Sequence, residues 1–150
     1  MTTKSLSILL TGPGLSLQHC SHWSLALHSP NQTIGRIYQV SLISLPHLLY
    51  IFDVRDEVEL RSPGSEGSIE LASGFDWEDV KRVEAVVRGE KVPGDGAERR
   101  QDWVLRVVVG LEVEGLVPEG TAEVVEGCVG RSAGEVREVV GERWVGTEER

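Results

Sequence analysis

Residues 22–40, HWSLALHSPNQTIGRIYQV, carry the pattern that decides the fold. Apolar and polar side chains alternate over residues 22–28, so the apolar ones share one face of an extended strand. That face comprises Trp23, Leu25 and Leu27. The alternation resumes over residues 34–40, after a short loop that contains a proline. The spacing therefore predicts an antiparallel hairpin.

Further strands are expected on both sides of this hairpin. An apolar run over residues 5–11 ends at a Gly-Pro-Gly turn, and a run rich in Leu, Ile, Tyr and Phe covers residues 48–54. A polar segment, 57–61, is a further strand candidate. The cluster of Ser and Gly over residues 62–68 is predicted to be a turn.

In the second half of the chain the apolar period changes from two to nearly four, which predicts helices. Asp76 and Gly89 bound the first helix, and the second runs from Glu98 to Glu114. A capping-box pattern opens the third at Ser132. The side chains expected to pack inward are Val80, Val83 and Val87; Trp103, Val104, Val107, Val108 and Leu111; Val136, Val139, Val140 and Trp144; and Trp77.

The order of these elements indicates the fold class. Strands come first and helices later, which argues for an α+β fold rather than a βαβ alternation. We expect a single domain over residues 1–150 that is strand-rich over 1–72 and helix-rich over 73–150. Its expected architecture is an antiparallel sheet of about four to five strands packed against about three helices.

The charge distribution narrows the function classes. The 150 residues include 24 acidic and 15 basic side chains, a formal charge of −9, and no acid precedes Asp53. Nucleic acid is not an expected partner, because phosphate binding needs clustered Lys and Arg. No apolar run is long enough to span a bilayer and no secretory signal is recognised, so we expect a cytoplasmic protein that binds no membrane. No phosphate-binding loop or metal-ligand spacing occurs, so neither a cofactor nor a metal is expected, and the partner is an unidentified small molecule or protein.

Cys20 and His22 are the candidate catalytic pair. A thiol within hydrogen-bond distance of an imidazole is an activated nucleophile. Alternate residues of a regular strand lie about 7 Å apart, so this pairing requires a local bend. The alternative is a buried thiol beside a partly exposed histidine. The other cysteine, Cys128, lies in a segment to which the sequence assigns no element.

Two parts of the chain together resemble a known family. The first is the pair HW, 22–23, at the start of a strand, followed by the strand GRIYQV, 35–40. The second is QDWV, 101–104, at the start of a helix that ends with LEVEGLV, 111–117. Over residues 20–117 the chain resembles small fungal proteins of uncharacterised-domain families with a permuted papain-like (NlpC/P60-like) fold.

The resemblance implies a permuted papain-like topology, in which the histidine strand precedes the cysteine helix. His22 matches the family histidine, but Arg100 occupies the nucleophile position, and its guanidinium stays protonated. The resemblance therefore implies a non-catalytic binding or accessory protein with a degenerate thiol-hydrolase-like cleft, a pseudoenzyme. The implied binding residues are Arg100, Trp23, Gln101, Asp102 and Trp103.

Other interpretations of these residues stay open. Trp23 and Trp103 are expected core aromatics, and Asp102 is a favourable charge in the first helical turn. Arg100 is either a solvated side chain or, if it lies beside His22 in a cleft, a group suited to a carboxylate or another anion. Two other functions also stay open. One is a thiol-dependent hydrolase or acyltransferase that uses Cys20 and His22, and the other is an acidic protein-interaction domain.

Overall fold

The computed structural model describes residues 3–14, 20–30, 32–44, 49–61, 63–94 and 99–146. Over these ranges the chain forms a six-stranded sheet, with the helices following five of the strands. The strands are β1 (Lys4–Thr11), β2 (His22–His28), β3 (Ile34–Ser44), β4 (Leu49–Glu59), β5 (Ser65–Phe75) and β6 (Trp144–Val145). The helices are α1 (Trp77–Gly89), α2 (Arg100–Val113), α3 (Thr121–Glu126) and α4 (Ala133–Val140), and a short 3-10 helix covers Gly141–Arg143.

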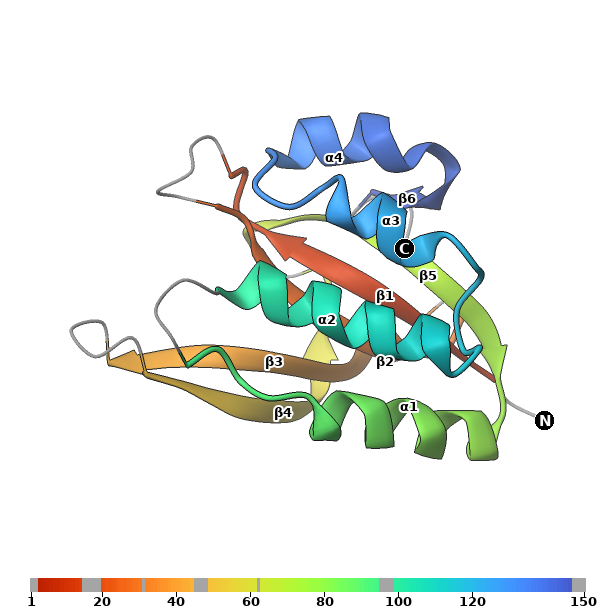
Figure 1. Cartoon of the computed structure of the whole chain (residues 1–150). Coiled ribbons are helices and arrows are strands. Elements are labelled where there is room, and N and C mark those ends of the chain that lie inside the picture. Colours follow the sequence, from red (N-terminus) through yellow and green to blue (C-terminus); the bar gives the residue numbers. More distant parts are fainter. Residues whose placement is uncertain are drawn as a thin grey trace.

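The strand order in the sheet is β4-β3-β2-β1-β5-β6, and each neighbouring pair is antiparallel. Figure 1 shows α1 and α2 against one face of this sheet, with α3 and α4 near β5 and β6. This arrangement confirms the predicted α+β class and the predicted hairpin over residues 22–28 and 34–40. The permuted papain-like topology stays a prediction.

The main core lies between the sheet and the helices. Alternate residues of β1 and β2 face it, as the period of two predicts. These are Leu6, Ile8 and Leu10 with Trp23, Leu25 and Leu27. The helix α2 adds five fully buried side chains: Trp103, Val104, Val107, Val108 and Leu111. Full burial of a side chain of this size stabilises the fold by about 1.5–3 kcal/mol, which offsets the modest helix propensity of the Val-rich segments.

A smaller apolar cluster lies on the other face of the sheet. It comprises Leu9, Ala26, Ile37 and Leu60. Leu60 directly follows β4, and its backbone N–H donates to the carbonyl oxygen of Thr33 at 2.7 Å. Because β4 is at one edge of the sheet and β5 lies beyond β1, the chain that leaves β4 crosses this face and covers it with Leu60.

Two predictions about the strands are wrong. The polar candidate 57–61 is not a separate strand, because β4 continues to Glu59 through a bulge. At Glu57, where φ is 54°, β4 has one residue more than β3, and an extra residue of this kind bends a strand without ending it. The predicted turn over 62–68 is too long, since β5 begins at Ser65.

The helix starts follow the sequence signals. The carboxylate of Asp76 accepts from the N–H of Asp79 at 2.8 Å, and the carboxylate of Asp79 accepts from the N–H of Asp76 at 3.1 Å. Ser132 and Glu135 make the same reciprocal pair at the start of α4. These contacts confirm both predicted caps. The helix α3 was not predicted, because six residues are too few to show a helical period.

Two of the side chains expected to pack inward do not. Trp77 is 71% exposed and Val139 is 46% exposed. Trp77 lies in the first turn of α1, about a quarter turn around the helix from the buried valines, and Lys81 Nζ lies 5.9 Å from its ring centroid. Trp144, in contrast, is partly buried and packs against the main core, as predicted.

Candidate functional site

His22, at the start of β2, is bound through both ring nitrogens. Its Nδ1 contacts Nη1 of Arg100, the first residue of α2. Its Nε2 lies 2.9 Å from Oε1 of Gln39 on β3. The backbones of β2 and β3 pair only as far as Leu25 and Tyr38, so His22 and Gln39 lie beyond the last pair. The imidazole of His22 on β2 is therefore contacted by one side chain from β3 and one from α2.

The partners of His22 decide its protonation state. A guanidinium group can only donate, so Nδ1 must accept from Arg100, and the ring proton resides on Nε2, which donates to Gln39. Burial lowers the pKa of His22, the positive charge of Arg100 lowers it further, and the hydrogen bond to Gln39 acts in the opposite direction. The imidazole is consequently neutral near pH 7.

A second layer of contacts orients Gln39. Its Nε2 donates to Oδ2 of Asp53 on β4 at 3.2 Å, and Nε of Arg55 donates to the same oxygen at 2.8 Å. The hydrogen bond from Gln39, together with Arg55, lowers the pKa of Asp53 against the opposing effect of desolvation. Asp53 can accept only from the amide NH₂, so the amide oxygen of Gln39 is directed at His22. Neither Gln39 nor Asp53 was predicted, because the contacts from Asp53 to Gln39 and from Gln39 to His22 depend on the pairing of three strands.

Gln101 attaches the start of α2 to the strand that carries His22. The side chain of Gln101 is 5% exposed. Its Nε2 donates to the carbonyl oxygen of Ser21 at 2.9 Å, and its Oε1 accepts from the N–H of Gly130 at 2.8 Å. These bonds hold Arg100 opposite His22. Gln101, an expected binding residue, thus connects the start of α2 to Ser21 and Gly130, and its binding role stays a prediction.

The other expected binding residues are two core aromatics and one residue of the first turn of α2. Trp23 and Trp103 are fully buried, and the ring of Trp103 lies 5.9 Å from that of Phe52 on β4. The carboxylate of Asp102 accepts from the N–H of Arg99 at 2.9 Å, which caps α2. The binding roles of the two tryptophans and Asp102 stay predictions, while Arg100 and His22 are the pair that the fold brings into contact.

The two cysteines lie in different surroundings. Cys20 is half-buried and precedes His22 by two residues. A thiol at this position could use His22 as a base only after Arg100 had left Nδ1, since Nε2 carries the proton. Cys128 is buried, its Sγ contacts the carbonyl oxygen of Val124 at 3.4 Å, and burial raises its pKa. Catalysis by Cys20 stays a hypothesis.

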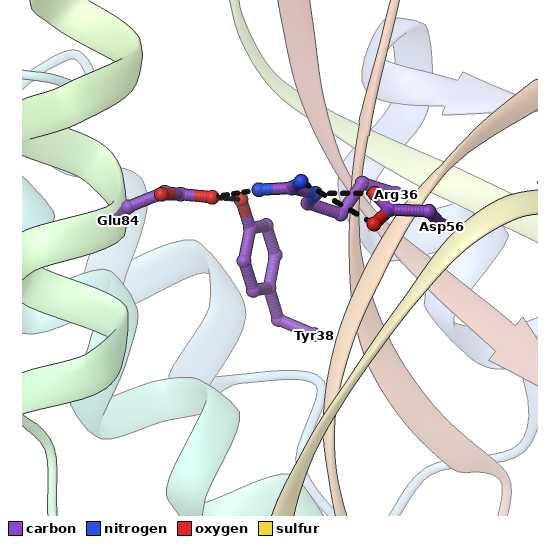
Figure 2. A network of polar contacts seen from close by, with 4 residues as sticks. All are labelled: Arg36, Tyr38, Asp56 and Glu84. Carbon is purple, nitrogen blue, oxygen red and sulfur yellow. Dashed lines mark hydrogen bonds and ion pairs between the residues drawn. The ribbon is translucent and has the colours of Figure 1, made fainter.

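A second polar network joins α1 to the sheet (Figure 2). Tyr38 on β3 donates to Oε1 of Glu84 on α1 at 2.5 Å, and Arg36 contacts the same carboxylate. Nε of Arg36 also lies 2.6 Å from Oδ1 of Asp56 on β4. The bond from Tyr38 and the charge of Arg36 lower the pKa of Glu84, while burial raises the pKa of Tyr38. We call these four residues the α1 latch.

The described part of the chain contains no group of three or more His, Cys, Asp or Glu side chains that could hold a metal ion. Two of the four histidines, His19 and His47, lie outside the described residues. None of the described helices is both long enough and apolar enough to cross a membrane.

Known proteins give no further information about this site. The chain matched no protein-family model, no curated protein sequence and no solved structure. Its function is therefore inferred from the arrangement of Arg100, His22 and Gln39.

Proposed function

We propose that this protein is a non-catalytic binding protein whose site has the arrangement of a thiol hydrolase but lacks the nucleophile. The observation that carries the proposal is a series of two side-chain contacts, from Arg100 to His22 and from His22 to Gln39. The three side chains come from α2, β2 and β3, and each is held by neighbours within the fold.

Thiol hydrolases need three groups that contact one another in a comparable series. A thiolate lies at a helix N-terminus, an imidazole accepts its proton, and a polar side chain orients the imidazole. Here Gln39 orients His22, and the Nδ1 lone pair of His22 is directed at the first residue of a helix. Because that residue is Arg100, the lone pair meets a protonated donor in place of a thiol, and no attack on an acyl group can start there.

The experiment restores a thiol at position 100. In an Arg100→Cys variant made in a Cys20→Ser background, the rate of iodoacetamide labelling is followed against pH. We expect the introduced thiol to have a pKa below the ordinary value of about 8.5, because the helix N-terminus and the imidazole stabilise the thiolate. Adding His22→Ala should raise that pKa.

The matched control is Arg99→Cys in the same background, one residue earlier at the helix cap. Labelling at position 99 should not respond to His22→Ala. An ordinary thiol pKa at position 100 that His22→Ala leaves unchanged would overturn the proposal, because the site would then lack the geometry of a nucleophile and its base.

The same labelling experiment on the unmodified chain tests the alternative function, a thiol-dependent hydrolase or acyltransferase. The observation in its favour is that Cys20 is half-buried and only two residues from His22. A labelling pKa of Cys20 that is well below about 8.5 and rises in His22→Ala would favour that enzyme. An ordinary rate would count against it.

A further inference from the structure

Arg100 carries a positive charge for which the described residues provide no carboxylate. Other arginines of the chain contact acids: Arg36, Arg55, Arg61, Arg82 and Arg131 each form an ion pair. Arg100 is half-buried, and its partner within the described ranges is the neutral ring of His22. Asp102 is close in sequence, but its carboxylate caps the N–H of Arg99. Partly buried charges are normally paired, and within the described ranges the guanidinium of Arg100 meets a neutral ring in place of a carboxylate.

The geometry of the side chain indicates what would pair with it. A guanidinium group has five N–H donors in a planar fork, and Arg100 directs Nη1 at His22. The remaining donors match the two oxygens of a carboxylate. Arg100 is also the first residue of the fourteen-residue helix α2, whose N-terminal dipole favours a negative charge.

We propose that Arg100 and His22 bind the carboxylate group of an acidic ligand together with one proton. This inference rests on the proposed function and names the ligand class and the pH dependence of the same site. Without ligand, Nδ1 of His22 accepts from Arg100. With ligand, a carboxylate oxygen lies between the two side chains and accepts from both.

The second of these contacts requires the proton. The carboxylate cannot donate to Nδ1, so His22 must carry a proton there to make the contact. That proton comes from solvent, and the proton on Nε2 stays in its bond to Gln39. The carboxylate contributes one negative charge and the proton one positive charge. The site therefore keeps the charge of Arg100, and the imidazolium is stabilised by an anion in direct contact.

The groups around His22 allow Nδ1 to become protonated when a carboxylate binds. Arg100 faces it from α2 and opposes protonation in the unliganded site. Gln39 faces it from β3 and connects it to Asp53 and its partner Arg55 on β4. On its own segment Cys20 is the nearest titratable residue in sequence. An anion placed between His22 and Arg100 offsets the positive charge of Arg100, so its binding should raise the pKa of His22. For the same reason the anion should bind more tightly as pH falls toward the pKa of the unliganded ring.

The test measures the pKa of His22 by NMR in sodium acetate and in sodium chloride of equal ionic strength. We expect acetate to raise this pKa, and the affinity for acetate to increase by up to about tenfold for each unit by which pH falls between the two pKa values. His28 serves as the internal control, because its ring lies within hydrogen-bond distance of Ser7 and of the carbonyl oxygen of Ser29.

Two variants separate the contribution of Arg100 from general screening. Arg100→Gln keeps a donor near Nδ1 but removes the charge, and it should abolish the acetate effect. Arg99→Gln removes the neighbouring charge and should preserve it. An equal pKa of His22 in acetate and chloride would overturn the inference, and an equal or larger increase in sulfate would overturn the assignment of a carboxylate.

The outcome is separable from that of the proposed function. If His22 activates the thiol of Arg100→Cys but acetate leaves the pKa of His22 unchanged, the inference fails and the proposed function stands. If acetate raises the pKa but the introduced thiol is ordinary, the carboxylate site stands and the thiol-hydrolase arrangement fails.

Discussion

Arg36 and Arg100 are both partly buried arginines at the interface between helices and sheet, and their surroundings are opposite. Arg36 lies between two carboxylates, those of Asp56 and Glu84. Arg100 contacts the neutral ring of His22. The charge of Arg36 is compensated by carboxylates from within the chain, one of them on α1, so the α1 latch connects α1 to the sheet. The charge of Arg100 is not compensated by the described residues, which leaves it suited to a ligand.

The largest expected effect concerns the packing behind the site. Trp103 follows Arg100 by three residues, is fully buried and contacts Phe52 on β4. Trp103→Ala should reduce the free energy of unfolding by about 3–5 kcal/mol, measured by urea denaturation. The control is Val109→Ala on the exposed side of the same helix, which should change it by less than about 0.5 kcal/mol. An unchanged midpoint for Trp103→Ala would mean that the buried face of α2 is wrongly assigned.

The second prediction compares the two arginine networks directly. Glu84→Ala leaves the buried hydroxyl of Tyr38 without its acceptor, and the free energy of unfolding should fall by about 1–3 kcal/mol. Glu84→Gln should recover part of this loss, since the amide oxygen can still accept. Arg100→Ala should cost less than about 1 kcal/mol, because it leaves none of the described carboxylates unpaired. Equal losses for Glu84→Ala and Arg100→Ala would break the distinction between a latch and an open site.

The third prediction separates the networks by pH. The folded state holds the pKa of His22 below 6.5, so the unfolded chain takes up the proton first and stability decreases as pH falls below about 6.5. The pKa of Glu84 is held below 4.5, so its contribution is present above that pH and is lost as pH falls through the folded pKa. Urea midpoints against pH should show that His22→Gln reduces the change below 6.5 and that Glu84→Gln reduces only the change below 4.5. If both variants changed the stability over the same pH range, the assignment of the two ranges to His22 and Glu84 would be wrong.

The smallest expected effects come from the helix caps. Asp102→Ala removes the acceptor of the Arg99 N–H, and Ser132→Ala removes the acceptor of the Glu135 N–H. Each should cost about 1 kcal/mol in thermal or urea denaturation. If Asp102 has only this structural role, Asp102→Ala should leave the acetate effect on His22 intact. Loss of that effect at unchanged stability would instead give Asp102 a direct part in binding.

The sequence predicted the elements better than the contacts between them. The hairpin strands, the buried face of α2 and the caps at Asp76 and Ser132 were all predicted correctly. The failures have a common cause. The bulge at Glu57 and the short helix α3 produce no periodic signal of their own, and Trp77 lies at the border of its helix face.

For the candidate site, the sequence indicated His22 and Arg100, and the structure added Gln39 as a third member. His22 and Arg100 were singled out from a resemblance, and the structure places them in contact. Gln39 was not singled out, although it is a polar residue on β3. Its role depends on reaching His22 past the end of the β2–β3 pairing and on being oriented by Asp53 from a third strand.

By itself the sequence determined the strands, the helices, their buried faces and their caps, because periodicity and capping depend on residues within a few positions of one another. Only the tertiary structure decided which arginine is compensated. Arg36 meets carboxylates from β4 and α1, whereas Arg100, at the end of α2, meets an imidazole from β2. Those encounters depend on strand order, register and a bulge. All three are set by contacts between distant parts of the chain, which is why no local pattern of residues reveals them.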